Sequence, residues 1–592
     1  MDLPSRDEIS TDYRFDLTKI FETPAEWTAA RDELFERLEK LHSLATEPPE
    51  TTNELEEILA ETAECYRLRG RLDLYATLSR NVNTGSETAA NRQREFRDLE
   101  ASFDPVVATV HRTLGNIDDA DFTALIEPME DYRYYAENLR IQARHVRSPD
   151  VETVIAEHEE VRSGPDRILR SITTEDFTPP EVTRPDGRTV EIRPGNYRTE
   201  LSDPDRNYRR RVYEAYHTER HRFAATLIRS SAEKLSAAAT ESSVRGYDAI
   251  RDRDLRGTYP ESGLEPAVPE SVHDTLVEAV RTNLEPYHRA QRLRRERLGV
   301  EKLRPWDRHV SLAEPPAPAI EYTDALEFII DSLTPLGKEY VDRARNFLHD
   351  RRIDVYPTQN KRTDIPAYCP SSTTDGAFVL ANFQGDVRTM FFIAHELGHA
   401  LNVAYHREGP TRYATSPSAV CEVPSILHEL LLAERCMGEG GGLAAHARNR
   451  LVECVAGNLY RNARSAAYNH SLAIKIESGE ELTLEEARSI NDELREEFDP
   501  VYDRDGVIDR VGGIGTRIPY SSYQYVLGAT GALAVRDRLR ENSLSPQDYR
   551  RFLRQTGRRP PLESFSALSL DMLSKIPFER ATATFDGYLD EL

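Results

Sequence analysis

The chain has 592 residues, of which 39% are hydrophobic and 30% charged, and its mean hydropathy of −0.61 indicates a globular protein with a charged surface. Its formal net charge of −25 argues against nucleic acid as a partner, because phosphate binding needs clustered positive charge. The sequence has no apolar run of membrane-spanning length, and the acidic segment 1–17 lacks the apolar core of a secretory signal. We therefore expect a cytoplasmic protein that binds neither nucleic acid nor membranes.

Two further features of the composition bear on the environment of the protein. The five cysteines are scattered and lack the paired spacing of disulfide frameworks or thiolate zinc sites, which predicts reduced thiols. Only eight of the 77 basic residues are lysines, while 102 residues are acidic. Because salt screens the repulsion among surface acids, this balance favours a halophilic source; the alternative is an acidic mesophilic protein.

Apolar residues recur at three- and four-residue spacing along most of the chain, with charged residues between them. This pattern predicts amphipathic helices and therefore a mainly α fold. In chain order, helices are predicted over 26–43, 52–68, 89–103 and 208–240.

Few segments predict strands. The segment 181–194 has two β-prone runs around Pro-Asp-Gly and predicts a hairpin. The stretch GAFVLANF at 376–383 predicts a strand just before a helix, and EGGG at 439–442 predicts a flexible turn between helices. We expect a helical N-terminal unit over 1–195 and a larger unit over 196–592.

The segment 391–402, FFIAHELGHALN, predicts a helix that is apolar on nearly every side yet carries three polar groups in its middle. Burying such groups without partners costs several kcal/mol. His395 and His399 are four residues apart, so on a helix both imidazoles can reach one metal ion. Glu396 is turned by about 100° around the helix, which suits it to a water molecule beside the metal.

A third ligand is expected from the next helix, because a zinc hydrolase needs three protein ligands and an open position. The run CEVPSILHELLLAE begins an apolar-periodic segment with Glu422 near its start. Ser425 and Glu429 share the face of Glu422 and are predicted to orient the ligands through hydrogen bonds. The alternative for Glu429 is a solvated acid.

Two neutral imidazoles and one carboxylate leave a zinc site with net positive charge, which favours activation of water for attack on a peptide carbonyl. Glu396 would accept the proton and pass it to the leaving amine. The oxyanion needs further donors, and the late stretch VGGIGTRIPYSSYQYVLG offers Tyr520, Tyr523 and Tyr525. Tyrosine hydroxyls are neutral donors at working pH; the alternative is that these are ordinary core tyrosines.

These residues resemble a known family. HELGHALN, followed by CEVPS with Glu422 23 residues after His399, is similar to the oligoendopeptidase F family of zinc metallopeptidases, relatives of thimet oligopeptidase. The similarity extends to LPSRDEISTDYRFDLTKIFETPAEW at the start, DPDRNYRRRVYEAY, GDVRTMFFIAHELGH and RIPYSSYQYVLGATG. It covers nearly the whole chain.

The resemblance implies a mainly helical, two-lobed ellipsoid with a deep substrate channel and a small β-sheet beside the HExxH helix. It implies cleavage of internal bonds in short unstructured peptides by a catalytic domain over 196–592. By this resemblance, His395, His399 and Glu422 correspond to the zinc ligands of the family, with one zinc ion per chain, and Glu396 corresponds to its general base.

Two segments are expected to contact substrate by the same resemblance. The strand before the HExxH helix would pair with the peptide backbone, and a glycine-rich loop near the C-terminus would contact the peptide together with the tyrosines. The corresponding residues are Gly376, Ala377, Phe378, Gly512, Gly513 and Gly515.

The sequence departs from the family at two positions. Tyr520 follows RIP where family members have a histidine, so it is the candidate donor in place of that group, and Asn402 stands where a histidine is common. Two other readings are a catalytically weak relative that binds peptides and a helical zinc carboxypeptidase, which also uses HExxH with a later glutamate.

Overall fold

The computed structural model describes residues 3–255, 268–312, 318–413, 417–508 and 519–590. Helices dominate these residues, so the mainly α fold predicted from the sequence is confirmed. The predicted helices over 26–43, 52–68 and 89–103 are each present, and the one over 208–240 is divided into two. No described helix has the length and the apolar composition that crossing a membrane requires.

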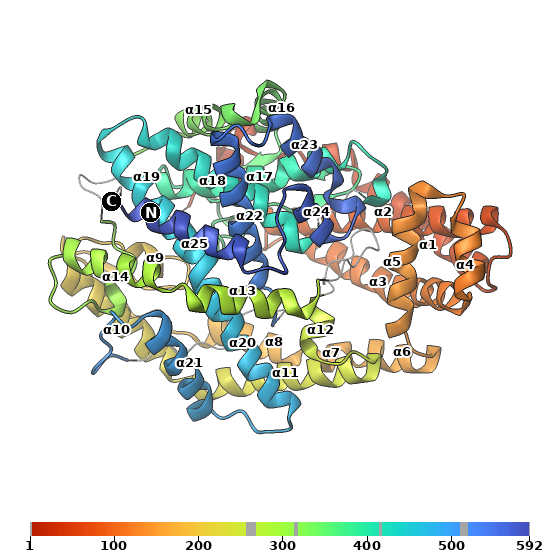
Figure 1. Ribbon diagram of the computed structural model, residues 1–592, viewed down its shortest axis with the longest axis horizontal. Coiled ribbons are helices and arrows are strands. Elements are labelled where there is room, and N and C mark those ends of the chain that lie inside the picture. Colours follow the sequence, from red (N-terminus) through yellow and green to blue (C-terminus); the bar gives the residue numbers. More distant parts are fainter. Residues whose placement is uncertain (1–2, 256–267, 313–317, 414–416, 509–518, 591–592) are drawn as a thin grey trace.

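The N-terminal part forms a helical bundle at one end of the molecule (Figure 1). Hydrogen bonds cap the start of its long helices. At the start of α2, the Thr51 side chain accepts a hydrogen bond from the Glu54 N–H, and the Glu54 carboxylate accepts one from the Thr51 N–H. A core of buried leucines and aromatic rings, including Trp27, joins the helices. They are α1 (Pro24–Leu44), α2 (Thr52–Val82), α3 (Glu87–Asn116), α4 (Asp119–Ile126) and α5 (Arg133–Gln142).

A second group of helices follows the bundle in the chain, and most of them lie in the lower part of the molecule in Figure 1. The longest of them, α11, packs against α20 and α21 of the C-terminal body. The group consists of α6 (Pro149–Glu157), α7 (Glu159–Arg162), α8 (Gly164–Ser171), α9 (Tyr197–Glu200), α10 (Arg206–His221), α11 (Ala224–Arg245) and α12 (Ile250–Asp254).

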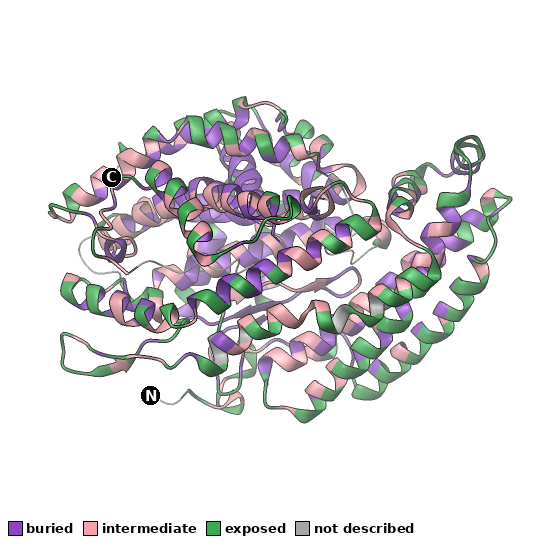
Figure 2. Cartoon of the chain, turned by 90° about the horizontal axis from the view of Figure 1, so that it is seen from below, coloured by how far each residue is buried: buried purple, intermediate pink, exposed green. Residues whose placement is uncertain are grey.

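The C-terminal body holds the largest core, and Figure 2 shows its buried residues gathered between helices whose outer faces are exposed. At its centre α18 packs against α17 and α22. Its helices are α13 (Glu270–Thr282), α14 (Glu285–Arg297), α15 (Tyr322–Ser332), α16 (Lys338–His349), α17 (Val387–His406), α18 (Ser418–Met437), α19 (Gly441–Val455), α20 (Asn462–Glu477), α21 (Leu484–Phe498), α22 (Tyr523–Arg540), α23 (Pro546–Gln555), α24 (Pro561–Ala567) and α25 (Ile576–Leu589).

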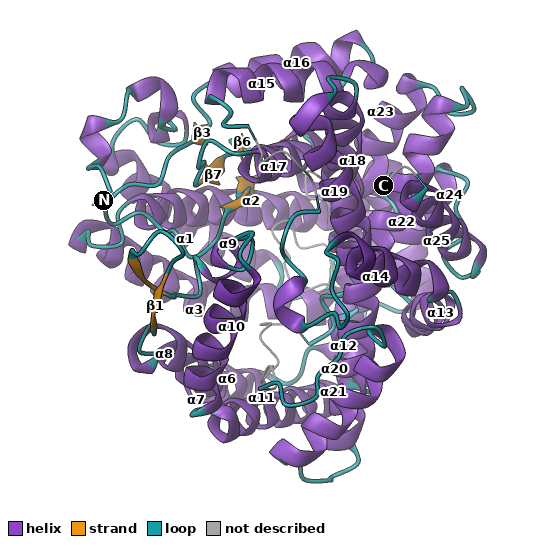
Figure 3. Ribbon diagram, turned by 90° about the vertical axis from the view of Figure 1, so that its left-hand side faces the viewer, coloured by secondary structure: helices purple, strands orange, loops and turns teal. Residues whose placement is uncertain are grey.

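The strands are short and form separate small sheets, seen in orange in Figure 3. The predicted hairpin is confirmed: β1 (Glu181–Thr183) pairs antiparallel with β2 (Thr189–Glu191). Near α17, β7 (Val379–Ala381) lies between β3 (Ile353–Asp354), which is parallel to it, and β4 (Ala367–Tyr368), which is antiparallel. This sheet agrees with the predicted small sheet beside the HExxH helix.

The segment 376–383 differs from the single strand predicted from its sequence. Gly376 has a φ of +79°, and β6 (Gly376–Ala377) pairs with β5 (Ser371–Ser372) in a sheet of its own. Phe378 separates β6 from β7: its N–H donates to the Pro370 carbonyl, and its side chain, like that of Leu380 in β7, lies in the core of the N-terminal bundle. The segment therefore forms two short strands that belong to different sheets.

The hydrophobic clusters bear on the domain division, which stays a prediction. The bundle core draws on residues from Phe15 to Leu139, but it also contains Phe378, Leu380 and Tyr413 from the C-terminal half. A separate small cluster around Tyr208 and Trp306 spans the predicted boundary near residue 195.

Candidate metal centre

Helix α17 holds the central motif. It begins after Asp386, whose side chain accepts from the Thr389 N–H and so caps the helix. His395 and His399 lie one turn apart on this helix, with ring centroids 5.0 Å from each other. Apolar residues of α17 pack into the large core around them, which fixes the direction in which the imidazoles point.

The two histidines meet Glu422 from α18. The Oε2 atom of Glu422 lies 3.4 Å from Nε2 of His395 and 3.6 Å from Nε2 of His399. One ligand atom from each of the three residues lies within 4.8 Å of the others, an arrangement that could hold one metal ion. Among the residues that the structure describes, no other group of three potential ligands meets this criterion.

Close helix packing brings these ligands together. A Cβ on Gly398 would lie only 2.5 Å from Ser425 Cα and 2.6 Å from the carbonyl oxygen of Pro424, both in the backbone of α18. A Cβ on Gly528 of α22 would likewise lie 2.3 Å from Glu422 Cβ. Both glycines therefore permit contact distances that a larger residue would prevent.

Hydrogen bonds orient each ligand. His395 donates from Nδ1 to Oε1 of Glu429 at 2.9 Å, which turns its Nε2 toward Glu422. The His399 ring hydrogen-bonds to the backbone of Cys421. Ser425 donates to Oε2 of Glu422 at 2.9 Å. Such outer contacts fix the tautomer and the direction of a metal-binding side chain.

Arg450 completes this arrangement from α19. It donates to Oε2 of Glu429 at 2.9 Å, so one carboxylate joins an arginine to His395. The sequence analysis did not identify Arg450. No spacing rule connects it with Glu429, because the two residues are 21 positions apart and meet only through the packing of α18 on α19.

The charges of the cluster follow from its packing. Burial would raise the pKa of Glu422, but His399, His395 and Ser425 lower it to about 2. Burial lowers the pKa of His399 to about 4, because it outweighs the attraction of Glu422. Burial opposes protonation of His395 as well, yet Glu422 and Glu429 together raise its pKa well above the usual value. The ionised carboxylate of Glu422 and the neutral imidazole of His399 are forms that bind a metal, whereas His395 has to release a proton to bind one.

Glu396 is buried beside this cluster, with 9% of its surface exposed. Burial raises its pKa to about 7; the charge of His395 opposes this rise, and those of Glu422 and Glu429 add to it. A carboxyl group with this pKa can both take up and release a proton near neutral pH.

The three candidate tyrosines have different surroundings. The pKa of Tyr525 is raised first by the charge of Glu422 and then by burial, and Glu396 also contributes, which places this phenol near the metal ligands. Tyr523 is buried and hydrogen-bonds with Ser418 at the start of α18. Tyr520 instead shares a 2.8 Å hydrogen bond with Nδ1 of His470 and packs against His273.

The residues predicted to contact substrate lie in two segments, and the structure describes one of them. Gly512, Gly513 and Gly515 lie outside the described residues. Gly376 and Ala377 are paired with β5, and the Phe378 N–H donates to the Pro370 carbonyl. Strand β7 is paired on both sides, so an added peptide strand would have to use an edge of β3, β4, β5 or β6.

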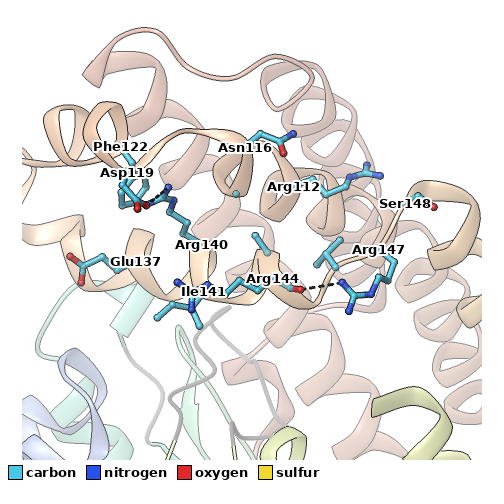
Figure 4. A pocket seen from close by; sticks show the side chains of 13 residues that line it. Arg112, Asn116, Asp119, Phe122, Glu137, Arg140, Ile141, Arg144, Arg147 and Ser148 are labelled. Carbon is cyan, nitrogen blue, oxygen red and sulfur yellow. Dashed lines mark hydrogen bonds and ion pairs between the residues drawn. The ribbon is translucent and has the colours of Figure 1, made fainter. Parts of the chain in front are cut away.

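A separate depression of about 760 Å³ lies on the N-terminal bundle (Figure 4). Four arginines line it, and two are held locally: Arg140 pairs with Asp119 at 2.9 Å, and Arg147 donates to the Arg144 carbonyl. None of its lining residues belongs to the predicted site.

Comparisons with known proteins identify the family. A family model described as "Peptidase family M3" matches residues 200–584, and one described as "Oligopeptidase F" matches residues 114–178. The chain belongs to peptidase family M3. The resemblance seen in the sequence is thereby confirmed, and membership implies that the chain hydrolyses peptides.

Curated members of the M3 family align over almost the whole chain. It is 25% identical to oligopeptidase PepF of Bacillus subtilis over 604 residues, covering 100% of this chain and 88% of that protein. It is 23% identical to group B oligopeptidase PepB of Streptococcus agalactiae, covering 99% of this chain and 98% of PepB.

Solved structures of the family share the fold. Oligoendopeptidase F from Enterococcus faecium superposes with a TM-score of 0.71 at 19% identity, covering 96% of this chain and 98% of that one. A structure of PZ peptidase A with an inhibitor gives a TM-score of 0.72 at 17% identity, with the same coverage.

Proposed function

We propose that this M3 peptidase is a zinc-dependent endopeptidase, located in the cytoplasm, that cuts internal bonds of short unstructured peptides. The observation that carries the proposal is the meeting of His395, His399 and Glu422 beside the buried carboxyl group of Glu396. Two imidazoles and one carboxylate are a ligand set typical of catalytic zinc, with one position left for water or substrate.

The donor set fits a single zinc ion per chain. Nε2 of both histidines faces Oε2 of Glu422, Glu429 binds the other ring nitrogen of His395, and Ser425 donates to Oε2 of Glu422 itself. A zinc ion supplies Lewis-acid polarisation of the substrate carbonyl and lowers the pKa of a nearby water molecule.

Glu396 would act as the general base. Because its pKa is about 7, its ionised form is available at neutral pH to take a proton from the attacking water. The same carboxyl group would then return the proton to the amine that leaves when the peptide bond breaks.

Tyr525 would stabilise the negative charge that develops on the carbonyl oxygen. Its raised pKa keeps the phenol protonated at working pH, and its surroundings include Glu422 and Glu396. A neutral hydroxyl donates a hydrogen bond without competing for the metal. Tyr520 and Tyr523 would act more indirectly, since each has another described partner.

The peptide would bind as an extended strand, with its backbone beside the segment Gly376–Phe378 and the glycine-rich loop around Gly512. Strand addition depends mainly on backbone hydrogen bonds and so accepts varied sequences. A halophilic source remains part of the proposal, because of the many acidic residues and the scarcity of lysine.

Glu396→Gln tests the mechanism. We expect this variant to lose nearly all cleavage of a quenched fluorescent peptide and to keep one zinc ion per chain, measured by mass spectrometry. The matched control is Glu541→Gln at the exposed end of α22, which should keep wild-type activity. Full activity in Glu396→Gln would refute the role of Glu396.

A C-terminally amidated peptide tests the mode of cleavage. An endopeptidase cuts amidated and free peptides alike, whereas a carboxypeptidase needs the free terminus. Cleavage restricted to the unblocked peptide would favour the carboxypeptidase alternative, and binding without cleavage by zinc-loaded protein would favour the peptide-binding alternative.

A further inference from the structure

A small cavity with an excess of positive charge is lined by residues of α14 and α19, and none of its lining residues is a predicted metal ligand. The volume within which the centre of a water molecule can move inside the cavity is about 30 Å³. Since one water needs about 10–15 Å³ of such space, the cavity has room for about two or three particles of that size. A peptide or a phosphate group would not fit.

The charged groups that line this cavity are unbalanced. They are the guanidinium groups of Arg294, Arg308 and Arg461 and the carboxylate of Glu453. An arginine side chain stays charged at every physiological pH, so the lining carries an excess of two positive charges when Glu453 is ionised. The cavity is therefore locally positive in a protein whose net charge is −25.

Glu453 is ionised and already engaged. Burial would raise its pKa, but the surrounding arginines, Arg294 first, lower it. Its Oε1 accepts from Arg294 at 2.6 Å, and its Oε2 lies 3.3 Å from Nη1 of Arg461. Glu453 therefore compensates only part of the charge around it.

Asp499, just behind the cavity, does not remove the excess. One of its oxygens lies 3.0 Å from Nη2 of Arg308, and the other accepts from Arg464. The positive charge of Arg464, the fourth arginine of the group, cancels the negative charge of Asp499. The excess within the group of described residues therefore stays at two.

The groups around the cavity are shielded from solvent to different extents: the side chains of Arg308 and Arg461 are 14% and 31% exposed, and others are more deeply buried. Arg294 is 6% exposed, and the neighbouring aromatic residues Tyr287 and Tyr502 are 4% and 7% exposed. The Arg308 guanidinium lies 4.4 Å from the ring centroid of Tyr502. Uncompensated charge in such surroundings is costly, and a counter-ion offsets that cost.

The backbone at this place is unusual as well. Ala456 and Arg461, which both line the cavity, are the first and last residues of a π-helical segment that continues α19. Helices of this type occur frequently at functional sites. Each lining guanidinium has five N–H donors and can donate to a further acceptor in the cavity.

We propose that this cavity is a binding site for a small inorganic anion, of which chloride is the natural example. The anion would accept hydrogen bonds from Arg308 and Arg461 and neutralise part of the excess positive charge. It would also hold α14 against α19, the helix that carries Arg450 toward the metal centre.

Crystals of the full chain grown in sodium bromide test the proposal directly. Bromide scatters anomalously, so we expect an anomalous peak in the cavity in contact with the Arg308 and Arg461 guanidinium groups. Arg461→Gln should lose the peak, while the matched control Arg292→Gln, at a half-exposed position of α14 outside the lining, should keep it. A wild-type cavity that holds only water would overturn the proposal.

Thermal melting gives a second readout that requires no crystals. Gluconate is an anion too large to enter the cavity. At equal ionic strength, the melting temperatures of the wild type and of Arg292→Gln should therefore be higher in chloride than in gluconate. Arg461→Gln should show a clearly smaller difference. The same difference in all three proteins would contradict a site in this cavity. Neither readout depends on zinc or on peptide cleavage.

Discussion

Gly398→Ala should damage the metal centre although it adds a single methyl group. Helix propensity alone predicts a gain of about 1 kcal/mol, because alanine is favoured over glycine inside a helix. In α17, however, the new Cβ would lie 2.5 Å from Ser425 Cα, whereas ordinary contacts begin at 3.4 Å. The backbone of α18 would have to move by about 0.9 Å, and overpacking of this kind costs about 1–3 kcal/mol.

This displacement should reach Glu422, which precedes Ser425 by three residues on α18. A misplacement of about 1 Å can cost about a hundredfold in rate, so we expect kcat/KM for a quenched peptide to fall by about that factor. Zinc affinity, measured by competition with a chelator, should fall in parallel.

Gly587→Ala is the matched control, because a Cβ at this position in α25 meets no atom within 4 Å. It should leave activity unchanged and stabilise the protein slightly. If Gly398→Ala kept wild-type zinc affinity and activity, the argument from close packing would be refuted.

Three further predictions concern single side chains. Tyr525→Phe should lower kcat by about 10²–10³ with zinc content unchanged; an unchanged kcat would remove Tyr525 from the reaction. Glu429→Gln should weaken zinc binding by about 10–100-fold, measured by chelator competition, and equal affinity would contradict its orienting role. Burial lowers the pKa of His111 to about 4, so the unfolded chain binds more protons below about pH 6.5, and the stability of the bundle should fall by up to about 3 kcal/mol between pH 6.5 and 4. His111→Phe should flatten this fall in urea unfolding followed by Trp27 fluorescence in a Trp306→Phe background, and an identical pH dependence would contradict the assignment.

The sequence predicted those site residues that lie on the same face of one helix, because their spacing follows the helical repeat. His395 and His399 are one turn apart, and Ser425 and Glu429 follow Glu422 by three and seven residues, so helical periodicity alone groups each set. The meeting of the two helices depends on glycine positions such as Gly398, whose role becomes visible only when α18 is placed against it.

Contacts between residues on distant segments could not be predicted from the sequence. Arg450 reaches Glu429 across a helix packing that no local pattern encodes. The three tyrosines look equivalent in the sequence, yet Tyr520 lies with His470 while Tyr525 lies near Glu422, because their backbone positions direct them to different sides.

The strand at 376–383 illustrates the same limit for the fold. Its β-prone residues predict one strand, but β6 pairs with β5 while β7 pairs with β3 and β4, and these partners come from other segments of the chain. Helix starts were easier to predict than helix ends: the helices predicted over 52–68 and 89–103 begin at Thr52 and Glu87 but extend to Val82 and Asn116.

The place of Phe378, Leu380 and Tyr413 in the bundle core also affects how the chain folds during synthesis. The rest of that core is complete in sequence at Leu139, about 240 residues before Phe378 leaves the ribosome. At about 5–20 residues per second, the nascent bundle would wait roughly 10–50 seconds with part of its apolar surface uncovered. Chaperones that bind exposed apolar segments would have this interval in which to act on it.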